Sequence, residues 1–320
     1  MSAPRVALIG ARRARQGLGP FVARDLVAAG LEVAGVLATS SETAAAAARE
    51  LEQRFAIRAC PYQSLEALLA AESPDALAIL SPPESHERFL RAALDARLHA
   101  LCEKPLVFGP PDFAARGGRL VDEFRARGLL LEENCQWPHV LDAFRRLHPG
   151  AGTAPPRAFA MLLAPAGRGR EALRDSLSHP LSLLQAVHHD PLARVDEIAY
   201  ERVAGAPERL RVRFRFGHGA ASVSCQVDLL ADDTLPRPAW LELDGRRAER
   251  RIRAADYRME LADGTRAVPL ADPLTAHLAR FADSLRATLA GAAPPDPGPI
   301  ARRLGMLAAL VDAFPIELQD

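Results

Sequence analysis

The sequence lacks the features that mark several protein classes. Its 320 residues carry 40 basic and 40 acidic side chains, so the formal net charge is +0 and no overall field attracts polyanions. Apolar runs such as Ala76–Leu80 are far shorter than the roughly 20 residues of a membrane span. Four cysteines without a CxxC pair indicate neither a disulfide framework nor a zinc cluster. The N-terminus is unlike a signal peptide. Together these absences predict a soluble, cytoplasmic protein with no nucleic-acid or membrane partner.

Lysine is almost absent from the chain. Of the 40 basic residues, 39 are arginine, and the only lysine is Lys104. Arginine stays charged, whereas lysine is a compact charge whose protonation can be tuned for proton chemistry. A bias toward arginine explains the other basic positions but not this one. We therefore interpret Lys104 as a functional residue, with chance as the alternative reading; Asn134 is likewise the only asparagine.

The length of the chain fits two domains, at roughly 100–200 residues per domain. In residues 1–125, short apolar strands alternate with helices, which predicts a doubly wound sheet of parallel strands joined by right-handed crossovers. The expected strands are Arg5–Ile9, Glu32–Leu37, Ala76–Leu80 and His99–Cys102, and the expected helices are Phe21–Ala29, Thr43–Phe55, Ser64–Ala71 and His86–Ala96.

Residues 126–320 have a different pattern, in which alternating strands predict an antiparallel meander. We expect an α+β domain for substrate binding and oligomerisation, built on a large, mostly antiparallel open sheet. Its last helices can pack back on the first domain. The expected strands are Leu129–Glu133, Arg157–Leu163, Val195–Val203, Leu210–Phe216, Ala220–Leu230, Trp240–Leu243, Arg250–Arg253 and Arg266–Val268, and the expected helices are Pro138–Leu147, Leu181–His188, Leu274–Leu289 and a last one ending near Phe314.

Three strand ends of the first domain carry unusual residues. Ligands of doubly wound sheets bind at the carboxyl ends of the strands. Gly10, Gly17 and Gly19 follow the first strand, where glycines allow a pyrophosphate to approach a helix N-terminus. This loop is longer than the usual fingerprint, and an ordinary loop is the alternative. Ser81-Pro82-Pro83 and Glu103-Lys104-Pro105 end two further strands.

The segment Ser81–His86, followed by a helix and then by His99–Leu106 with its Glu-Lys-Pro sequence, resembles the signatures of the Gfo/Idh/MocA oxidoreductases. The resemblance implies an N-terminal Rossmann domain, a C-terminal α/β domain with an open sheet, and nicotinamide-dependent hydride transfer at a C–OH/C=O centre. It also implies that Lys104 is the active-site lysine, beside the reacting oxygen.

The same resemblance assigns roles to the neighbours of Lys104. Glu103 positions the loop or contacts the cofactor. Ser81, Pro82 and His86 match the turn that lies along the cofactor, and a surface histidine at a helix N-terminus is the alternative for His86.

A second family signature, Asp-x-Gly-x-His-x-x-Asp, resembles the segment that begins at Asp175. The resemblance implies that His179 is a general base with Asp175 near it, a role that suits a side chain with a reference pKa near neutrality. Leu177 replaces the glycine and Ser182 the second aspartate. Pro180 disfavours helical geometry at His179. A helix-cap histidine is the alternative.

Asn134 and Trp137 resemble the family's interdomain segment, which approaches cofactor and substrate; packing at a domain joint is the alternative. The run His188-His189-Asp190 suggests a metal site at first sight. Adjacent residues on a helix point apart, so we interpret it as a helix C-terminus and expect no metal.

The cofactor is predicted to be NADP, with NAD as the other possibility. NAD-binding domains commonly place an acid after the second strand, where this chain has Ala38, followed by Thr39 and Ser40. Arg12 and Arg13 in the glycine loop can bind a phosphate bidentately. In the alternative interpretation these arginines hold a solvated loop and Glu42 reaches the ribose.

Strand alternation in Arg209–Phe216 puts four apolar residues on one face and four arginines on the other. Because the resemblance implies dimerisation through this sheet, we expect a homodimer or higher homo-oligomer with an ionic contact. A solvated monomer face is the alternative.

We therefore expect an NAD(P)-dependent oxidoreductase acting on a sugar, cyclitol or related small molecule, a substrate class that rests on the resemblance alone. A non-catalytic dinucleotide-binding sensor or scaffold is one alternative, favoured by the irregular glycine loop and the incomplete second signature. A reductase of an imine or conjugated substrate, which could dispense with His179, is another.

Overall fold

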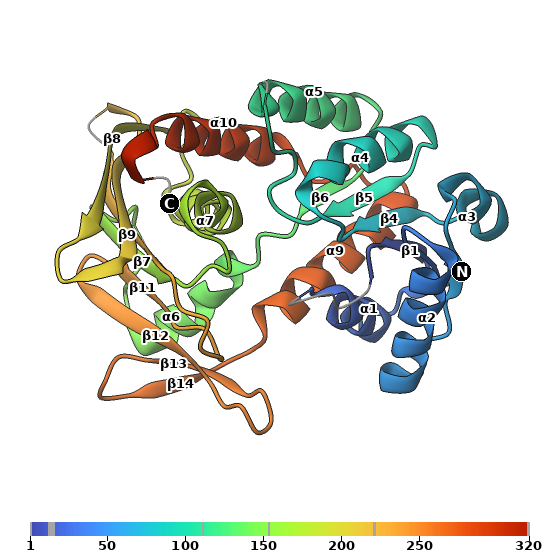
Figure 1. Ribbon diagram of the computed structural model, residues 1–320, viewed down its shortest axis with the longest axis horizontal. Coiled ribbons are helices and arrows are strands. Elements are labelled where there is room, and N and C mark those ends of the chain that lie inside the picture. Colours follow the sequence, from blue (N-terminus) through green and yellow to red (C-terminus); the bar gives the residue numbers. More distant parts are fainter. Residues whose placement is uncertain (1, 12–16, 111, 153, 220–221, 319–320) are drawn as a thin grey trace. The chain divides into compact units, whose positions relative to one another are not determined.

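The computed structural model describes residues 2–11, 17–110, 112–152, 154–219 and 222–318 (Figure 1). The chain forms two compact units. The first comprises residues 1–134 and 274–301, and the second comprises residues 135–273 and 302–320. The domain boundary expected at residue 125 lies before the strand at Leu131–Glu133, which pairs with the first sheet.

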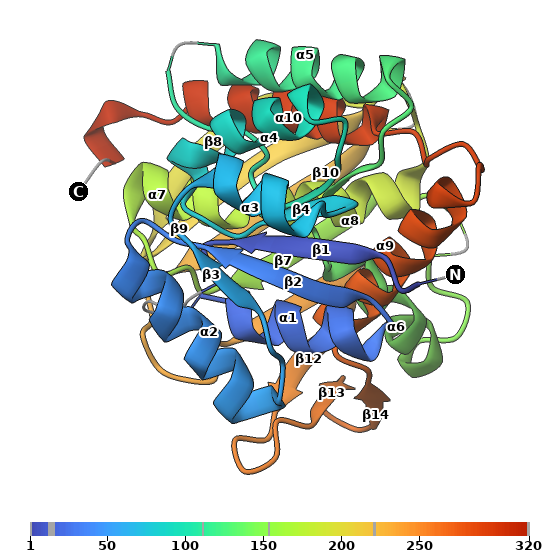
Figure 2. The same ribbon diagram turned by 90° about the vertical axis from the view of Figure 1, so that its right-hand side faces the viewer.

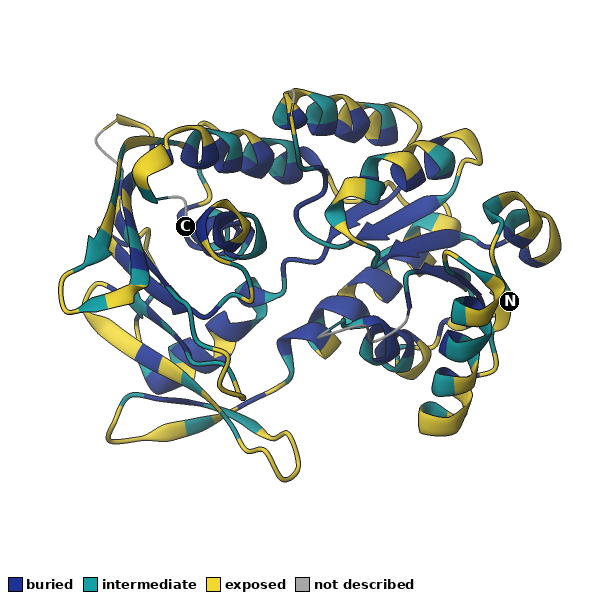
Figure 3. Cartoon of the chain, viewed as in Figure 1, coloured by how far each residue is buried: buried dark blue, intermediate teal, exposed yellow. Residues whose placement is uncertain are grey.

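The first unit contains a six-stranded parallel sheet in the order β3-β2-β1-β4-β5-β6. The order reverses between β1 and β4, which is where doubly wound sheets bind ligands. β4 and β5 are buried along their whole length (Figure 3), because helices cover both faces of the sheet. The predicted doubly wound sheet is confirmed. The strands are β1 (Arg5–Ile9), β2 (Glu32–Leu37), β3 (Cys60–Tyr62), β4 (Ala76–Ile79), β5 (His99–Cys102) and β6 (Leu131–Glu133).

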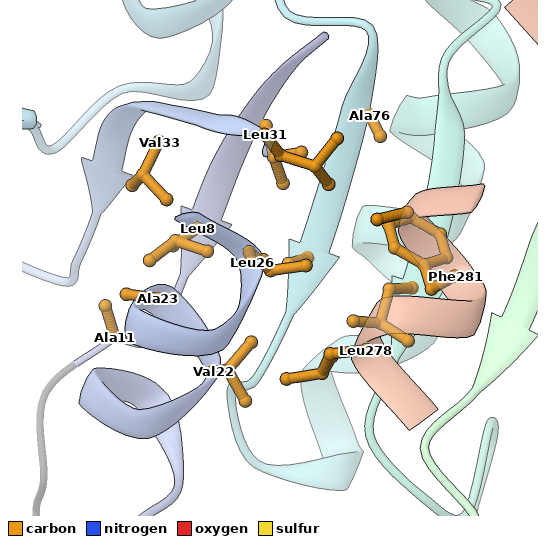
Figure 4. Packing of buried hydrophobic residues seen from close by; sticks show 14 of the residues in the cluster. Leu8, Ala11, Val22, Ala23, Leu26, Leu31, Val33, Ala76, Leu278 and Phe281 are labelled. Carbon is orange, nitrogen blue, oxygen red and sulfur yellow. The ribbon is translucent and has the colours of Figure 1, made fainter. Parts of the chain in front are cut away.

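Helices α1 and α2 lie on one side of this sheet and α4 and α5 on the other (Figure 2). A late helix, α9, belongs to the same core: its Leu278 and Phe281 pack with Leu8, Val22 and Leu26 (Figure 4). The helices of this unit are α1 (Gly19–Ala28), α2 (Ser41–Phe55), α3 (Leu65–Glu72), the 3-10 turn η1 (Pro83–Ser85), α4 (His86–Asp95), α5 (Phe113–Ala126) and α9 (Pro273–Leu289), whose first residue belongs to the second unit.

The second unit contains an eight-stranded sheet in the order β14-β13-β12-β11-β7-β10-β9-β8. The expected meander is interrupted, because β7 lies between β11 and β10 and pairs with β10 in parallel. All the other pairs are antiparallel, so the mostly antiparallel open sheet is confirmed. The strands are β7 (Ala158–Leu163), β8 (Arg194–Val203), β9 (Ala206–Gly217), β10 (Val223–Leu230), β11 (Ala239–Leu243), β12 (Arg246–Ile252), β13 (Met259–Ala262) and β14 (Ala267–Leu270).

The remaining helices follow β6 or lie near the C-terminus. They are η2 (Trp137–Val140), α6 (Leu141–Leu147), α7 (Gly169–Ser176), α8 (Ser178–His188), α10 (Gly298–Asp312) and η4 (Ile316–Leu318). Among the described residues, no helix combines the length and the apolar character that crossing a membrane requires.

The arginines on the polar face of β9 form ion pairs with acids of the neighbouring strands β8 and β10. Leu210, Val212, Phe214 and Phe216 are at most 3% exposed, as the alternation predicted. On the opposite face, Arg211 binds the buried Asp228 of β10 through two hydrogen bonds of 2.7 and 2.9 Å. Arg213 pairs with Glu201 of β8 at 2.9 Å. The homo-oligomer expected through this sheet stays a prediction.

Arg211 also pairs with Glu201 at 3.5 Å, and Glu201 is 45% exposed whereas Asp228 is 2% exposed. This difference predicts unequal effects of removing the two acids. Asp228→Ala should lower the free energy of unfolding by about 3 kcal/mol or more, because it strands Arg211 beside a buried position. Glu201→Ala should cost less than about 1 kcal/mol, because an exposed ion pair contributes little. Urea denaturation of the two variants measures both values. Equal effects would contradict this account of the sheet.

Candidate active site

The loops that follow β1 and β4 meet at the carboxyl edge of the parallel sheet. Gly10 has a φ of 81°, and a Cβ there would lie 2.8 Å from the backbone of Ser81. A Cβ on Gly19 would lie 2.2 Å from the carbonyl oxygen of Ala11. These two positions therefore require glycine for backbone packing. Gly17 lies half-buried just before α1, while the predicted Arg12 and Arg13 lie outside the described residues.

His86 connects the loop after β4 to the loop after β5. It is 0% exposed, so it is not the surface histidine of the alternative interpretation. Its Nε2 lies 2.7 Å from the carbonyl oxygen of Ser81, and its Nδ1 lies 3.0 Å from the carbonyl oxygen of Pro105. The imidazole thus bridges the two loops through their backbone carbonyls.

The turn that carries Lys104 is anchored on both sides. Before it, the side-chain amide of Asn134 donates to Glu103 Oε1 at 2.5 Å. After it, the backbone N–H of Leu106 donates to Glu133 Oε1 at 2.8 Å. Lys104 itself is half-buried, and its peptide bond to Pro105 is cis. The structure thus holds the single lysine between two fixed residues at the carboxyl edge of the sheet.

Ser81 and Pro82 form the turn that leads from β4 to α4. The hydroxyl groups of Ser81 and Ser85 lie 2.6 Å apart, and Pro82 directly precedes η1. Together with Gly10, His86 and Glu103, these residues are brought to one edge of one sheet, as the sequence predicted for a common site.

Glu133 is a site residue that the sequence analysis missed. It is the last residue of β6 and only 3% exposed. Burial, together with the carboxylates of Glu133 and Glu103, raises the pKa of the Cys102 thiol well above its usual value. The sequence signal for Glu133 was a pair of consecutive acids, Glu132 and Glu133, in a strand expected to be buried. Because carboxylates are almost never buried without partners, such a pair indicates specific contacts. Glu132 pairs with Arg280 of α9.

The second family signature lies in the second unit, at the junction of two helices. Asp175 lies in the last turn of α7 and pairs with Arg174 at 3.0 Å. His179, which is half-buried, is the second residue of α8. His179 is helical, although Pro180 was expected to disfavour helical geometry there. Pro180 lies in the first turn, where the missing N–H is not needed for the helix.

Asn134 and Trp137 belong to different units. Asn134 is the last residue of the first unit before the chain enters the second, and it is 2% exposed. Its Oδ1 is buried and has no hydrogen-bond partner among the described residues. Trp137 opens η2 in the second unit and is 4% exposed. Within the first unit, Asn134 contacts the Lys104 turn through Glu103.

Of the residues after β2, Ser40 already takes part in the start of helix α2. Ser40 is the N-cap of α2: its Oγ accepts a hydrogen bond from the Thr43 N–H at 3.2 Å. Thr39 is exposed beside it. Glu42, also exposed, has its pKa lowered, first by a hydrogen bond with the Ser40 side chain.

His188 ends α8, and His189 follows it in the left-handed conformation with a φ of 56°. This is the helix C-terminus that the sequence predicted. In the part of the chain that the structure describes, no group of three or more His, Cys, Asp and Glu side chains could hold a metal ion.

Comparison with known proteins agrees with this arrangement. The sequence profile of an oxidoreductase family with an NAD-binding Rossmann fold matches residues 4–133. A dTDP-3,4-didehydro-2,6-dideoxy-α-D-glucose 3-reductase from Streptomyces violaceoruber is 30% identical over a 285-residue alignment, which covers 82% of this chain and 80% of that protein. The chain therefore belongs to the Gfo/Idh/MocA family of NAD(P)-binding oxidoreductases.

Two further similarities differ in extent. A D-xylose 1-dehydrogenase (NADP(+)) from Haloferax volcanii is 40% identical over 88 residues, but this match spans only 26% of this chain and 27% of that enzyme. The solved structure of UDP-N-acetylglucosamine 3-dehydrogenase GnnA from Acidithiobacillus ferrooxidans aligns over 98% of this chain and 97% of that one. Its TM-score is 0.69 at 24% identity, which shows a common fold.

The contact between Glu133 and Leu106 predicts how the Lys104 turn responds to substitution. Glu133→Leu should lower the free energy of unfolding by about 1–3 kcal/mol, because it leaves a buried N–H unpaired. Glu133→Gln keeps an acceptor oxygen and should recover most of this loss. Urea denaturation compares the variants. Equal stability of the Leu and Gln variants would contradict an anchoring role for the carboxylate oxygen.

Proposed function

We propose that this protein is an NAD(P)-dependent oxidoreductase that transfers a hydride between nicotinamide and a C–OH or C=O centre of a sugar, a cyclitol or a related small molecule. The observation that carries the proposal is the anchored Glu103-Lys104-Pro105 turn at the carboxyl edge of the Rossmann sheet. The names of the relatives support it, since one is a sugar reductase and another a sugar dehydrogenase.

The first unit has residues that fit a dinucleotide. Gly10 packs on Ser81 and Gly19 on Ala11 without room for a Cβ at either glycine, as in the close backbone approach of a pyrophosphate-binding turn. The buried Oδ1 of Asn134 is an acceptor without a partner among the described residues, as expected of a group that faces a ligand. Gly10, Ser81, Glu103 and Asn134 would hold the cofactor, and the nicotinamide, when bound, supplies the hydride or accepts it.

Lys104 is the group that we assign to the reacting oxygen. Its ammonium would donate a hydrogen bond to that oxygen and exchange a proton with it as the oxygen changes between hydroxyl and carbonyl. Glu133 and His86 act through the backbone of the turn and are positioning residues. In the second unit, His179 is the proposed second proton-transfer group, with Asp175 near it in sequence. A sensor with the same fold would need no proton donor in this turn.

Substitution of the lysine tests this assignment. Lys104→Met should lower turnover by roughly 10²-fold or more, the usual scale for a positioned proton-transfer group, while the dissociation constant of NADPH changes by less than about tenfold. Arg97→Met, in the loop that precedes β5, is the control and should leave both values unchanged. Steady-state assays with any accepted sugar or polyol, and cofactor titration, give the two readouts. Wild-type turnover in Lys104→Met would refute the assignment.

We further propose that the cofactor is NADP. Ala38 stands at the end of β2, where an acid would repel a 2′-phosphate, and exposed hydroxyl residues follow it. The partly matching xylose dehydrogenase carries NADP(+) in its name. Arg12 and Arg13 are the proposed phosphate ligands.

Cofactor titration decides between the two dinucleotides. Wild-type protein should bind NADPH more tightly than NADH, and the double substitution Arg12→Ala/Arg13→Ala should weaken NADPH by tenfold or more while leaving NADH nearly unchanged, because a lost phosphate contact affects only the phosphorylated cofactor. Arg58→Ala, at a side chain 89% exposed, is the control. A wild-type preference for NADH, or equal weakening of both cofactors, would show that the phosphate argument is wrong.

A further inference from the structure

Arg250 is a cation on the core face of the second unit's sheet. It lies on β12, where its sheet partners are Ala239 of β11 and Leu261 of β13. These two neighbours are 2% and 0% exposed, and Ala248, two residues earlier on the same face of β12, is 0% exposed. Strand alternation therefore directs the Arg250 side chain inward, while Arg251 faces outward.

The guanidinium of Arg250 is held in place but not neutralised. Its Cζ lies 5.4 Å from the centre of the Trp137 ring, and its NH2 donates to the carbonyl oxygen of Arg237 at 3.1 Å. Its Nε is buried without a hydrogen-bond partner among the described residues. Burial lowers the pKa of Arg250, an effect that Tyr257 and Asp272 only partly offset.

Two buried acids of the described chain are paired with arginines, and Arg250 differs from them. Asp228 binds Arg211, and Glu132 binds Arg280. In the described ranges, no carboxylate oxygen lies within 4 Å of the Arg250 guanidinium. Arg250 is half-buried, and a partly desolvated charge without an ion-pair partner costs free energy, so its retention needs a reason other than stability.

Further polar atoms without partners among the described residues lie in the segments next to Trp137. Gln136 Oε1 and Ser178 Oγ are both buried and have no hydrogen-bond partner among the described residues. Gln136 directly precedes Trp137, and Cys135 Sγ lies 3.7 Å from the carbonyl oxygen of Ser178. Ser178 in turn precedes His179. Unsatisfied donors and acceptors thus extend from Arg250 across η2 to the start of α8, where the proposed proton-transfer histidine lies.

We propose that Arg250 binds an oxyanion of the substrate, so that the substrate is an anionic sugar derivative rather than a neutral sugar or cyclitol. This inference rests on the proposed function and specifies its substrate class. A guanidinium binds phosphate or carboxylate oxygens bidentately, and the Trp137 ring holds it in orientation. The oxyanion is either the diphosphate of a nucleotide-linked sugar or the carboxylate of a sugar acid.

Calorimetric titration with three probes tests the proposal. UDP represents the diphosphate, glucuronate the sugar carboxylate, and myo-inositol a neutral polyol. The wild type should bind UDP or glucuronate, and the anion that binds shows whether the oxyanion is a diphosphate or a carboxylate. Arg250→Met should weaken the binding of that anion at least tenfold. Arg251→Met, at an outward side chain 49% exposed, is the matched control and should bind the anion as the wild type does. Wild-type affinity in Arg250→Met, or a wild type that binds neither anion, would overturn the proposal.

Two further readouts separate this role from the alternatives. The melting temperature of Arg250→Met should equal or exceed that of the wild type, because the variant removes a partly desolvated charge that has no ion-pair partner among the described residues. A lower melting temperature with unchanged anion affinity would assign Arg250 a structural role and overturn the proposal. NADPH affinity should not change; a tenfold loss would place the cofactor's own phosphates at Arg250 instead. If anion binding is independent of Arg250 while Lys104→Met still abolishes turnover, the proposed function stands without this subsite.

Discussion

The buried imidazole of His86 links the ends of two adjacent parallel strands. One ring nitrogen contacts the carbonyl of Ser81, after β4, and the other contacts the carbonyl of Pro105, after β5. Ser81 in turn packs against Gly10 after β1. The position of Lys104 therefore depends on contacts along the carboxyl edge of the sheet, which run from Gly10 through Ser81 and His86 to Pro105.

Buried polar groups divide into two kinds in this chain. Asp228 and Glu132 are matched by arginines, and Glu133 accepts a backbone N–H, so these groups stabilise or anchor the fold. The Oδ1 of Asn134 and the Nε of Arg250 have no such partner among the described residues. Natural proteins leave few buried polar atoms unsatisfied, and the exceptions concentrate where a ligand binds. We assign Asn134 to the cofactor and Arg250 to the substrate on this ground.

Much of the first unit could be predicted from sequence, because its central strands are continuous apolar runs that end in glycine or proline. Helix α5 was missed because Gly117 and Gly118 lower its helix propensity, and β3 because it is three residues long and contains Pro61. Helix α7 and strand β13 were also missed, since both are short and polar in part. The insertion of β7 beside β10 depends on contacts between residues far apart in sequence, which a local pattern does not contain.

The residues gathered at the carboxyl edge of the first sheet were predictable where they are rare or belong to a signature, as with Lys104 and Asn134, while the role of His179 stays a prediction. It was not predictable where common residues occupy unusual environments. Glu133 and Arg250 are ordinary acidic and basic residues in the sequence, and only the strand register shows that each is directed into the protein. The burial of His86 likewise follows from tertiary packing and not from its motif.

A crystal structure of the protein with NADP+ tests the central claim most directly. The account predicts the nicotinamide beside Lys104, with its ring on the order of 5 Å from Nζ so that a substrate oxygen can reach both. The contacts of His86 and Glu133 should be unchanged. A dinucleotide bound away from the loops after β1, β4 and β5, or a Lys104 side chain directed away from the nicotinamide, would contradict the account.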